Sequence, residues 1–362
     1  MKSHSLQFRL IRLGLSGLVF HLLIFWGLST QPQFIERYYS RLVYPWITAV
    51  LSRFSGLIPF SLTEMALYAI AIGLPVSVVR HLKNKRQLGR VFGYWIVGAI
   101  WLVAWFYIAW GLNYFRQPLS DSLALPATAA DTTAVIDAFV VVTDRANSLS
   151  KQWQPLTRAE IETEIEAGIR RVQALVPFYR PTGQRRPKHL LLNTLLNKTL
   201  TTGFFSPVFH EVHLNADLLD IEYPFTLTHE KFHQMGFANE AEANFLAFLT
   251  CVSSSKALIQ YSAYLAAVRY LGARLRIALS DYEPYATLID TTVRRDFRRI
   301  RERWQKHAGR FSRISRKTYD RYLKANKIRE GMANYTGMVD YLVGFWLPRM
   351  KDLHRRTPKA RQ

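Results

Sequence analysis

Cysteine is nearly absent from this sequence of 362 residues, which contains only Cys251. A single thiol excludes a disulfide framework, and it also excludes a zinc finger built from several cysteines. Metal sites built from histidine and carboxylate side chains remain open. The sequence also lacks internal repeats, and its length predicts a membrane part together with one or two folded units.

Acidic residues are scarce beside basic ones: 26 Asp and Glu stand against 48 Lys and Arg, which gives a formal net charge of +22. Such an excess suits either nucleic acid or an anionic lipid surface as a partner. Much of the charge flanks apolar segments, and no recognised nucleic-acid-binding module accompanies the most basic stretch, Arg294 to Lys317. We therefore expect membrane lipids as partners and no nucleic acid.

Three apolar segments in the first third of the chain predict transmembrane helices, at about 10–28, 62–79 and 91–112. A helix of roughly 20 residues crosses a hydrocarbon core of about 30 Å. Arg12 interrupts the first segment, so that helix would span from Leu13 onward and act as an uncleaved signal anchor. The alternative is that these segments are buried helices of a soluble all-α protein. The third segment opposes it, because it is apolar all round.

The distribution of basic residues predicts which side of the membrane each part occupies. The short loop from His81 to Arg90 and the N-terminus are both basic, which places them in the cytoplasm. Three spans would then place everything after Leu112 on the outer side of a multi-pass cell-membrane protein. Arginines in the loop 29–61 oppose this orientation, because that loop would also lie outside.

Composition divides the chain into three parts. Residues 1–117 form the predicted membrane region, 118–134 are rich in Pro, Ser, Thr and Ala and predict a linker, and 135–362 form a predicted folded domain. The pattern after Thr226 is helical almost to the end, and Lys188–Asn193 and His210–Leu218 look like strands. The predicted fold is therefore mainly α, with three N-terminal transmembrane helices and an α-rich domain that contains a small β element.

The stretch from His229 to His233 reads HEKFH and predicts a metal site. Residues four apart share one face of a helix, so the imidazoles of His229 and His233 can reach the same ion. Glu230 follows the first histidine, where its carboxylate can act as a general base on water at an open coordination position. This is the arrangement that a zinc hydrolase needs.

The residues that follow supply a third ligand. Gly236 can end the first helix and Asn239 can cap a second one, which would return a carboxylate to the two histidines. Glu240 is the predicted third ligand, with Glu242 in reserve, and Asn244 could orient an imidazole.

Two features depart from common zinc-protease motifs. The pattern HExxHxxGxxH would place a third histidine at position 239, but the chain has Asn239 there, and a neutral amide is a poor zinc ligand. Lys231 lies inside the motif, where uncharged residues are usual, and helical spacing directs it away from the histidine face. The alternative without a metal site is that these residues are two surface histidines beside an acidic helix.

These motifs resemble a known family. The resemblance is carried by Gly203–Asn215, Pro224-Phe225, His229–His233, Gly236-Phe237, Glu240–Leu249, Tyr322–Ala325, Gly331 and Tyr335–Asp340. Together they are similar to bacterial membrane proteins catalogued as domain of unknown function 3810, whose members have N-terminal transmembrane helices followed by an HExxH domain. The resemblance implies a zincin-like metallopeptidase domain of unsettled substrate. The ExxAN spacing from Glu240 also resembles the third-ligand helix of Ste24-type and ImmA-type zinc peptidases, which implies that Glu240 is the ligand.

Two further elements are candidates for roles in substrate binding. His210 and His213 would point to opposite faces of a strand, so a second metal site is doubtful, and that strand would instead hold an extended peptide at its edge. The alternative is an ordinary strand with solvent-facing histidines. Tyr335 is a candidate to stabilise the oxyanion, because a phenol can donate a hydrogen bond where charge develops.

The sequence thus predicts a membrane-anchored zinc metallopeptidase that cleaves a peptide or protein substrate at the outer face of the cytoplasmic membrane. His229, His233 and Glu240 would hold Zn²⁺, and Glu230 would be the catalytic base. One alternative is a noncatalytic membrane scaffold with a structural zinc site. Another is an intramembrane protease, which the polar residues around the motif oppose. Oligomeric state and cleavage specificity stay open.

Overall fold

Contacts within the chain divide it into two compact units, each described here by itself. The structure is a computed structural model that describes residues 2–23, 27–126, 129–176, 178, 186–326, 328 and 337–350. Unit 1 comprises 1–117, 181–191 and 205–211, and unit 2 comprises 118–180, 192–204 and 212–362. The stretch 118–134 therefore belongs to unit 2, and it contains the short helix α6 (Leu119–Ser122).

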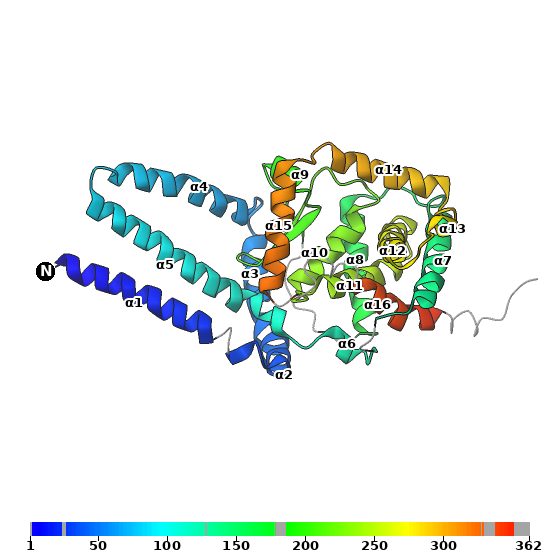
Figure 1. The fold of residues 1–362 in the computed structure, drawn as a ribbon, viewed down its shortest axis with the longest axis horizontal. Coiled ribbons are helices and arrows are strands. Elements are labelled where there is room, and N and C mark those ends of the chain that lie inside the picture. Colours follow the sequence, from blue (N-terminus) through cyan, green and yellow to red (C-terminus); the bar gives the residue numbers. More distant parts are fainter. Residues whose placement is uncertain are drawn as a thin grey trace, which may run out of the picture. The chain divides into compact units, whose positions relative to one another are not determined.

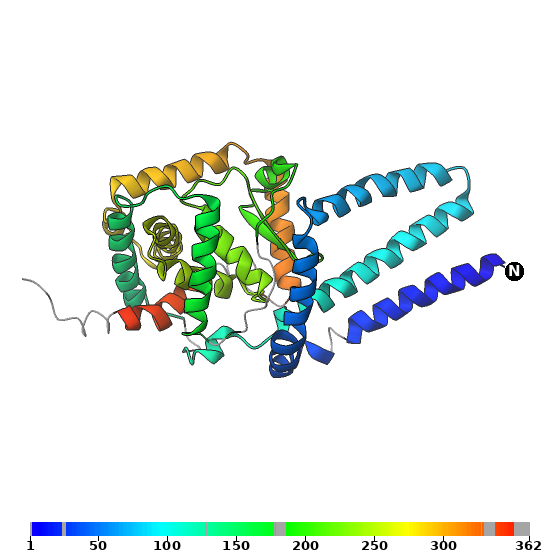
Figure 2. The same cartoon turned by 180° about the vertical axis from the view of Figure 1, so that it is seen from behind.

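Unit 1 is helical. Its elements are α1 (Lys2–Leu23), α2 (Pro32–Phe34), the π-helix η2 (Ile35–Val43), α3 (Tyr44–Gly56), α4 (Leu62–His81), α5 (Lys85–Ala109) and the 3₁₀ helix η3 (Gly111–Phe115). α4 and α5 form a hairpin, and α1 lies alongside α5 (Figures 1 and 2). Within the hairpin, the indole Nε1 of Trp95 donates to Ser77 Oγ at 3.1 Å.

Two helices in the part of the chain that the structure describes are long and apolar enough to cross a membrane, rather than the three that the sequence predicted. They are Leu62–His81 and Gln87–Ala109, and only 6% and 11% of their most apolar windows are buried. Of the first predicted span, 10–28, the described residues include the apolar helix Ile11–Leu23, which alone is shorter than the roughly 20 residues that a crossing needs. Residues 24–26 of that span lie outside the described residues. The third predicted span ends early, because the helix stops at Ala109.

One predicted strand is absent and the other is shorter than predicted. Residues 188–193 form no strand beyond an isolated bridge at Lys188, and the backbone amide of Leu191 bonds to a side chain. Lys188 Nζ donates to Glu211 at 2.7 Å, and the Leu191 amide donates to Glu64 at 2.7 Å. The observed sheet has two strands, β1 (Gly203–Ser206) and β2 (Glu211–Leu214).

Unit 2 is a helical bundle. Its helices are α6, α7 (Thr132–Leu149), α8 (Arg158–Gln173), α9 (Asn193–Thr199), α10 (Tyr223–Gln234), α11 (Glu240–Val252), α12 (Ala257–Ala278), α13 (Glu283–Ala286), α14 (Thr291–Gln305), α15 (Arg310–Ala325), α16 (Met338–Tyr341) and the π-helix η5 (Leu342–Trp346). α12 packs against α7, α10 and α11, and Figures 1 and 2 show it nearly end-on among them. α10 and α11 therefore lie in the interior of this unit.

The single cysteine lies where α10 meets α11. Cys251 is fully buried, and its Sγ is 3.3 Å from the hydroxyl of Thr228. Burial raises the pKa of the thiol to about 12. Cys251 is thus a packing residue of the helix pair, as a buried uncharged thiol usually is.

Candidate metal centre

The helix pair α10–α11 forms as its sequence predicts. Pro224 occupies the first turn of α10, where its missing N–H is not needed. Gly236 follows the helix with φ of 91°, a left-handed conformation that glycine adopts without strain. Asn239 Oδ1 then accepts hydrogen bonds from the amides of Ala241 and Glu242 and caps α11. The chain therefore reverses within a few residues, and the start of α11 lies over the last turns of α10.

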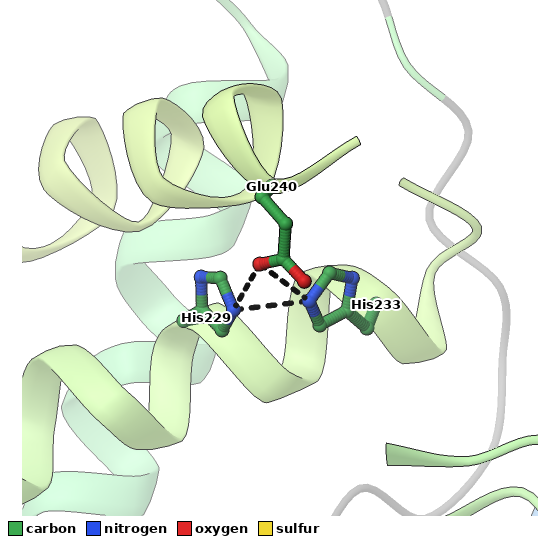
Figure 3. Close-up of side chains that lie close together, drawn as sticks. All are labelled: His229, His233 and Glu240. Carbon is green, nitrogen blue, oxygen red and sulfur yellow. Dashed lines mark hydrogen bonds and ion pairs between the residues drawn. The ribbon is translucent and has the colours of Figure 1, made fainter. Parts of the chain in front are cut away.

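This reversal brings three potential ligands together (Figure 3). Glu240 Oε2 lies 3.2 Å from His229 Nε2 and 3.4 Å from His233 Nε2, and the two Nε2 atoms are 3.0 Å apart. Their donor atoms all lie within 4.8 Å of one another, so the three residues could hold a metal ion. The predicted set of three ligands is therefore gathered at one point by two adjacent helices.

The hydrogen bonding of His233 fits it for a metal. Its Nδ1 lies 2.7 Å from the carbonyl oxygen of Phe237, a partner that can only accept. Nδ1 must then carry a proton, so Nε2, which faces His229 and Glu240, is the nitrogen that could bind a metal. Metal-bound histidines are commonly oriented in this way by a backbone carbonyl. Two imidazoles and a carboxylate are also a ligand set that suits zinc.

The charges of the centre are strongly coupled. Burial alone would lower the pKa of His233, but the neighbouring carboxylate of Glu240 outweighs it and raises that pKa to about 9. Burial would raise the pKa of Glu240, but the two imidazoles hold it well below its usual range. Without a metal, the site thus keeps an anionic carboxylate that attracts a proton to His233. A divalent cation would take the place of that proton, because metal ligands must be deprotonated.

Glu230 is buried beside the same centre. Its charge contributes to the raised pKa of His233, which places it within electrostatic reach of the predicted ligands. The backbone of Gly203 in β1 fits closely against the stem of Glu230. A Cβ atom at position 203 would lie 3.0 Å from Glu230 Cγ and 2.9 Å from the carbonyl oxygen of His213. Only glycine leaves room for this carboxylate.

The reserve ligand Glu242 is engaged elsewhere. Its Oε1 accepts a hydrogen bond from the amide of Leu119 at 2.7 Å and lies 3.4 Å from the hydroxyl of Tyr341. Glu242 thus connects α11 with α6 and α16, while Glu240 lies with the two histidines. Asn244 is buried nearby, but none of its hydrogen bonds among the described residues reaches either histidine.

Lys231 is buried in unit 2 instead of pointing into solvent. Only 2% of its side chain is exposed, and its Nζ lies 2.9 Å from Glu166 Oε1 on α8. The lysine inside the motif therefore fastens α10 to α8 on the side away from the histidines. This contact explains how a charged residue is accommodated within the motif.

Tyr319 is a site residue that the sequence did not reveal. Its hydroxyl donates to Glu240 Oε1 at 2.6 Å from α15, so it holds the carboxylate oxygen opposite the one that faces the imidazoles. No motif marks it, because it stands in a basic helix far along the chain. Tyr335, the predicted oxyanion partner, lies outside the described residues.

The upstream histidines have separate neighbours. The ring of His210 lies 3.2 Å from the carbonyl oxygen of Ala109 and contacts Tyr44, and burial lowers the pKa of His210 to about 4. His213 stacks on Phe204 at a centroid distance of 4.4 Å. Both histidines are buried. The alternative of a strand with solvent-facing histidines is therefore wrong.

The comparisons identify the family. A family model described as "Protein of unknown function (DUF3810)" matches residues 39–343. The chain belongs to this family. The match covers the α4–α5 hairpin, the α10–α11 pair and α15, so the DUF3810 region contains both candidate spans and the metal centre. No curated protein and no solved structure matches the chain.

Proposed function

We propose that this DUF3810 protein is a membrane-anchored zinc metallopeptidase of zincin-like type. The observation that carries the proposal is the convergence of His229, His233 and Glu240 with the buried carboxylate of Glu230 beside them. Three protein ligands leave a position for water or substrate, which is typical of catalytic zinc sites, whereas structural sites usually have four ligands.

Each residue has a defined role in this proposal. Bound zinc would polarise the scissile carbonyl and lower the pKa of a water molecule. Glu230 takes a proton from the attacking water and delivers it to the leaving amine. Tyr319 holds the carboxylate of Glu240 in place by its hydrogen bond, and the Phe237 carbonyl holds His233.

We also propose that the metal centre lies outside the cytoplasm. The short connection between α4 and α5 is basic, with Arg80, Lys83, Lys85 and Arg90 around it. A basic connection favours the cytoplasmic side, and a two-helix hairpin then returns the chain to the outer side before unit 2 begins. α1 decides only the side of the N-terminus, so unit 2 lies on the same side whether or not α1 spans the membrane.

Replacing Glu230 by Gln tests the catalytic part of the proposal. The variant keeps size and hydrogen bonding, so it should retain about one zinc per chain and the wild-type fold. It should lose about 10²–10⁴-fold in turnover, because a positioned general base contributes that much. Turnover is measured on a peptide pool by mass spectrometry, with metal content measured on the same samples.

The matched control is Glu302→Gln, an exposed glutamate on α14. It should cleave the pool as wild type does. A noncatalytic scaffold with a structural zinc site makes the opposite forecast: Glu230→Gln would behave like wild type in every assay. Full complementation of a deletion strain by stably expressed Glu230→Gln protein would overturn the peptidase proposal.

A further inference from the structure

An apolar cavity of about 450 Å³ lies against α9 and α15 in unit 2. Its lining is formed by Thr199 of α9 and by a face of α15 that includes Phe311, Ile314, Tyr319 and Tyr322. Pockets that bind small ligands or side chains typically fall between about 300 and 1,000 Å³. Phe311 and Ile314 are 51% and 60% exposed, so the cavity is open to a ligand from solvent.

One side chain connects this cavity with the metal centre. Tyr319 lines the cavity, and its hydroxyl donates to Glu240 Oε1 at 2.6 Å. The other oxygen of Glu240 lies 3.2 Å from His229 Nε2. One wall residue of the cavity is thus hydrogen-bonded to a predicted metal ligand, so a molecule that fills the cavity would contact the residue that holds this ligand.

The opposite border of the cavity is cationic. Helical spacing places Phe311, Ile314 and Tyr322 on one stripe of α15, with Tyr319 along one edge. The same spacing places Arg310, Lys317 and Arg321 along the other edge, and all three are exposed. Across the helix surface the order is therefore metal centre, apolar stripe, cationic row.

We infer that the cavity receives an apolar side chain of the peptide substrate, and that the cationic row selects an acidic residue beyond it. This inference rests on the proposed function. The occupant is a peptide because the cavity adjoins the centre at which the peptide bond would be cleaved. Its acidic character follows from charge complementarity with the row on α15 and with a chain of net charge +22.

The inference is tested by equilibrium binding, so that cleavage does not interfere. Full-length Glu230→Gln protein is placed in neutral-lipid nanodiscs and titrated into fluorescent peptides. One peptide position is Phe or Ala, and the residues beyond it are Glu or Lys. Burial of an aromatic side chain should make the Phe peptide bind about tenfold or more tightly than the Ala peptide. The Glu version should bind more tightly than the Lys version.

Two variants in the same background locate these preferences. Ile314→Asp should abolish the preference for Phe. Ile277→Asp, the same substitution at another exposed isoleucine near the end of α12, should keep it. Replacing both Lys317 and Arg321 of the protein by Glu should make the Lys peptide bind more tightly than the Glu peptide. Arg316→Glu, on another face of α15, should leave the preference in place.

Specific outcomes overturn the inference. Equal binding of Phe and Ala peptides, or an Ile314→Asp protein that discriminates as Ile277→Asp does, would rule out the cavity as the side-chain site. The same titrations are repeated in anionic nanodiscs. If every variant loses its peptide preference there but not in neutral nanodiscs, the apolar stripe of α15 binds lipid instead. If the peptides bind as expected but wild-type protein cleaves none of them, the peptidase proposal fails while the binding site stands.

Discussion

The helix pairs α4–α5 and α10–α11 place opposite kinds of residue in opposite surroundings. Every residue of α10 is buried, including His229, Glu230, Lys231 and His233. In α4 only 6% of the most apolar window is buried, although α4 is far more apolar than α10. One pair therefore buries charge, and the other exposes hydrocarbon.

The difference shows that these two regions are suited to different solvents. A buried charge is costly unless it is paired or holds a metal, and the described contacts supply a partner for Lys231 and for Glu240. An exposed apolar helix is costly in water but not in a lipid bilayer. Substitutions in and around the two helix pairs should therefore have different kinds of effect, on membrane topology for α4–α5 and on metal binding or folding for α10–α11.

The largest effect concerns the side of the membrane, which is all or none. A reporter enzyme that is active only outside the cytoplasm, fused after Gln362, should be active in cells. Replacing Lys83, Lys85 and Arg90 by Glu should reduce that activity, because the connection between α4 and α5 would lose its cytoplasmic preference. A fusion that works only as a cytoplasmic reporter would show that unit 2 lies inside the cell.

The next effect concerns two glutamates on the same helix. Glu240→Ala should lose its stoichiometric zinc on dialysis, because two histidines alone bind zinc weakly. Glu242→Ala should retain zinc, since this side chain bonds to Leu119. Metal analysis of both purified proteins checks the difference. Zinc retained by Glu240→Ala and lost by Glu242→Ala would reverse the assignment of the third ligand.

A buried ion pair should matter more for folding than an exposed one. Glu166→Ala removes the carboxylate that lies 2.9 Å from the buried Nζ of Lys231 and should destabilise the protein by about 3–5 kcal/mol. Glu164→Ala removes a pair with Arg171, whose side chain is 43% exposed, and should cost about 1 kcal/mol or less. Denaturant unfolding of the two variants measures both. Equal destabilisation would show that burial of Lys231 does not set the difference.

The smallest effect concerns the hydrogen bond from α15. Tyr319→Phe removes the donor to Glu240 Oε1 and should weaken zinc binding by about 10–100-fold, because partners that orient ligands contribute that much. Tyr285→Phe on α13 serves as the control, with affinity measured by competition with a chelator. Wild-type affinity in Tyr319→Phe would mean that α10 and α11 alone fix the carboxylate.

The local part of the metal centre could be predicted because its residues are close in sequence. The spacing of His229 and His233, the turn at Gly236 and the cap at Asn239 bring Glu240 back within two helical elements. The sequence favoured Glu240 over Glu242, but it could not predict what Glu242 does instead. The partners of Glu242, Leu119 and Tyr341, come from distant parts of the chain.

Residues that act through tertiary packing escaped prediction for the same reason. Tyr319 reaches Glu240 from α15, and nothing in its neighbourhood distinguishes it from other tyrosines. The strand predicted at 188–193 was wrong, and the backbone amide of Leu191 bonds instead to the carboxylate of Glu64, which lies far away in sequence. Hydrophobicity predicted the α4–α5 hairpin well, but it overestimated the first span.

Because its single thiol, Cys251, is buried, the folded protein should not react with thiol-alkylating reagents. The thiol is enclosed between α10 and α11 and stays protonated at neutral pH, and only the thiolate is reactive. A cysteine introduced at any exposed position would therefore be the single labelling site of the native protein, without replacement of the natural residue. Modification of Cys251 itself would report the opening of the helix pair that carries the metal ligands.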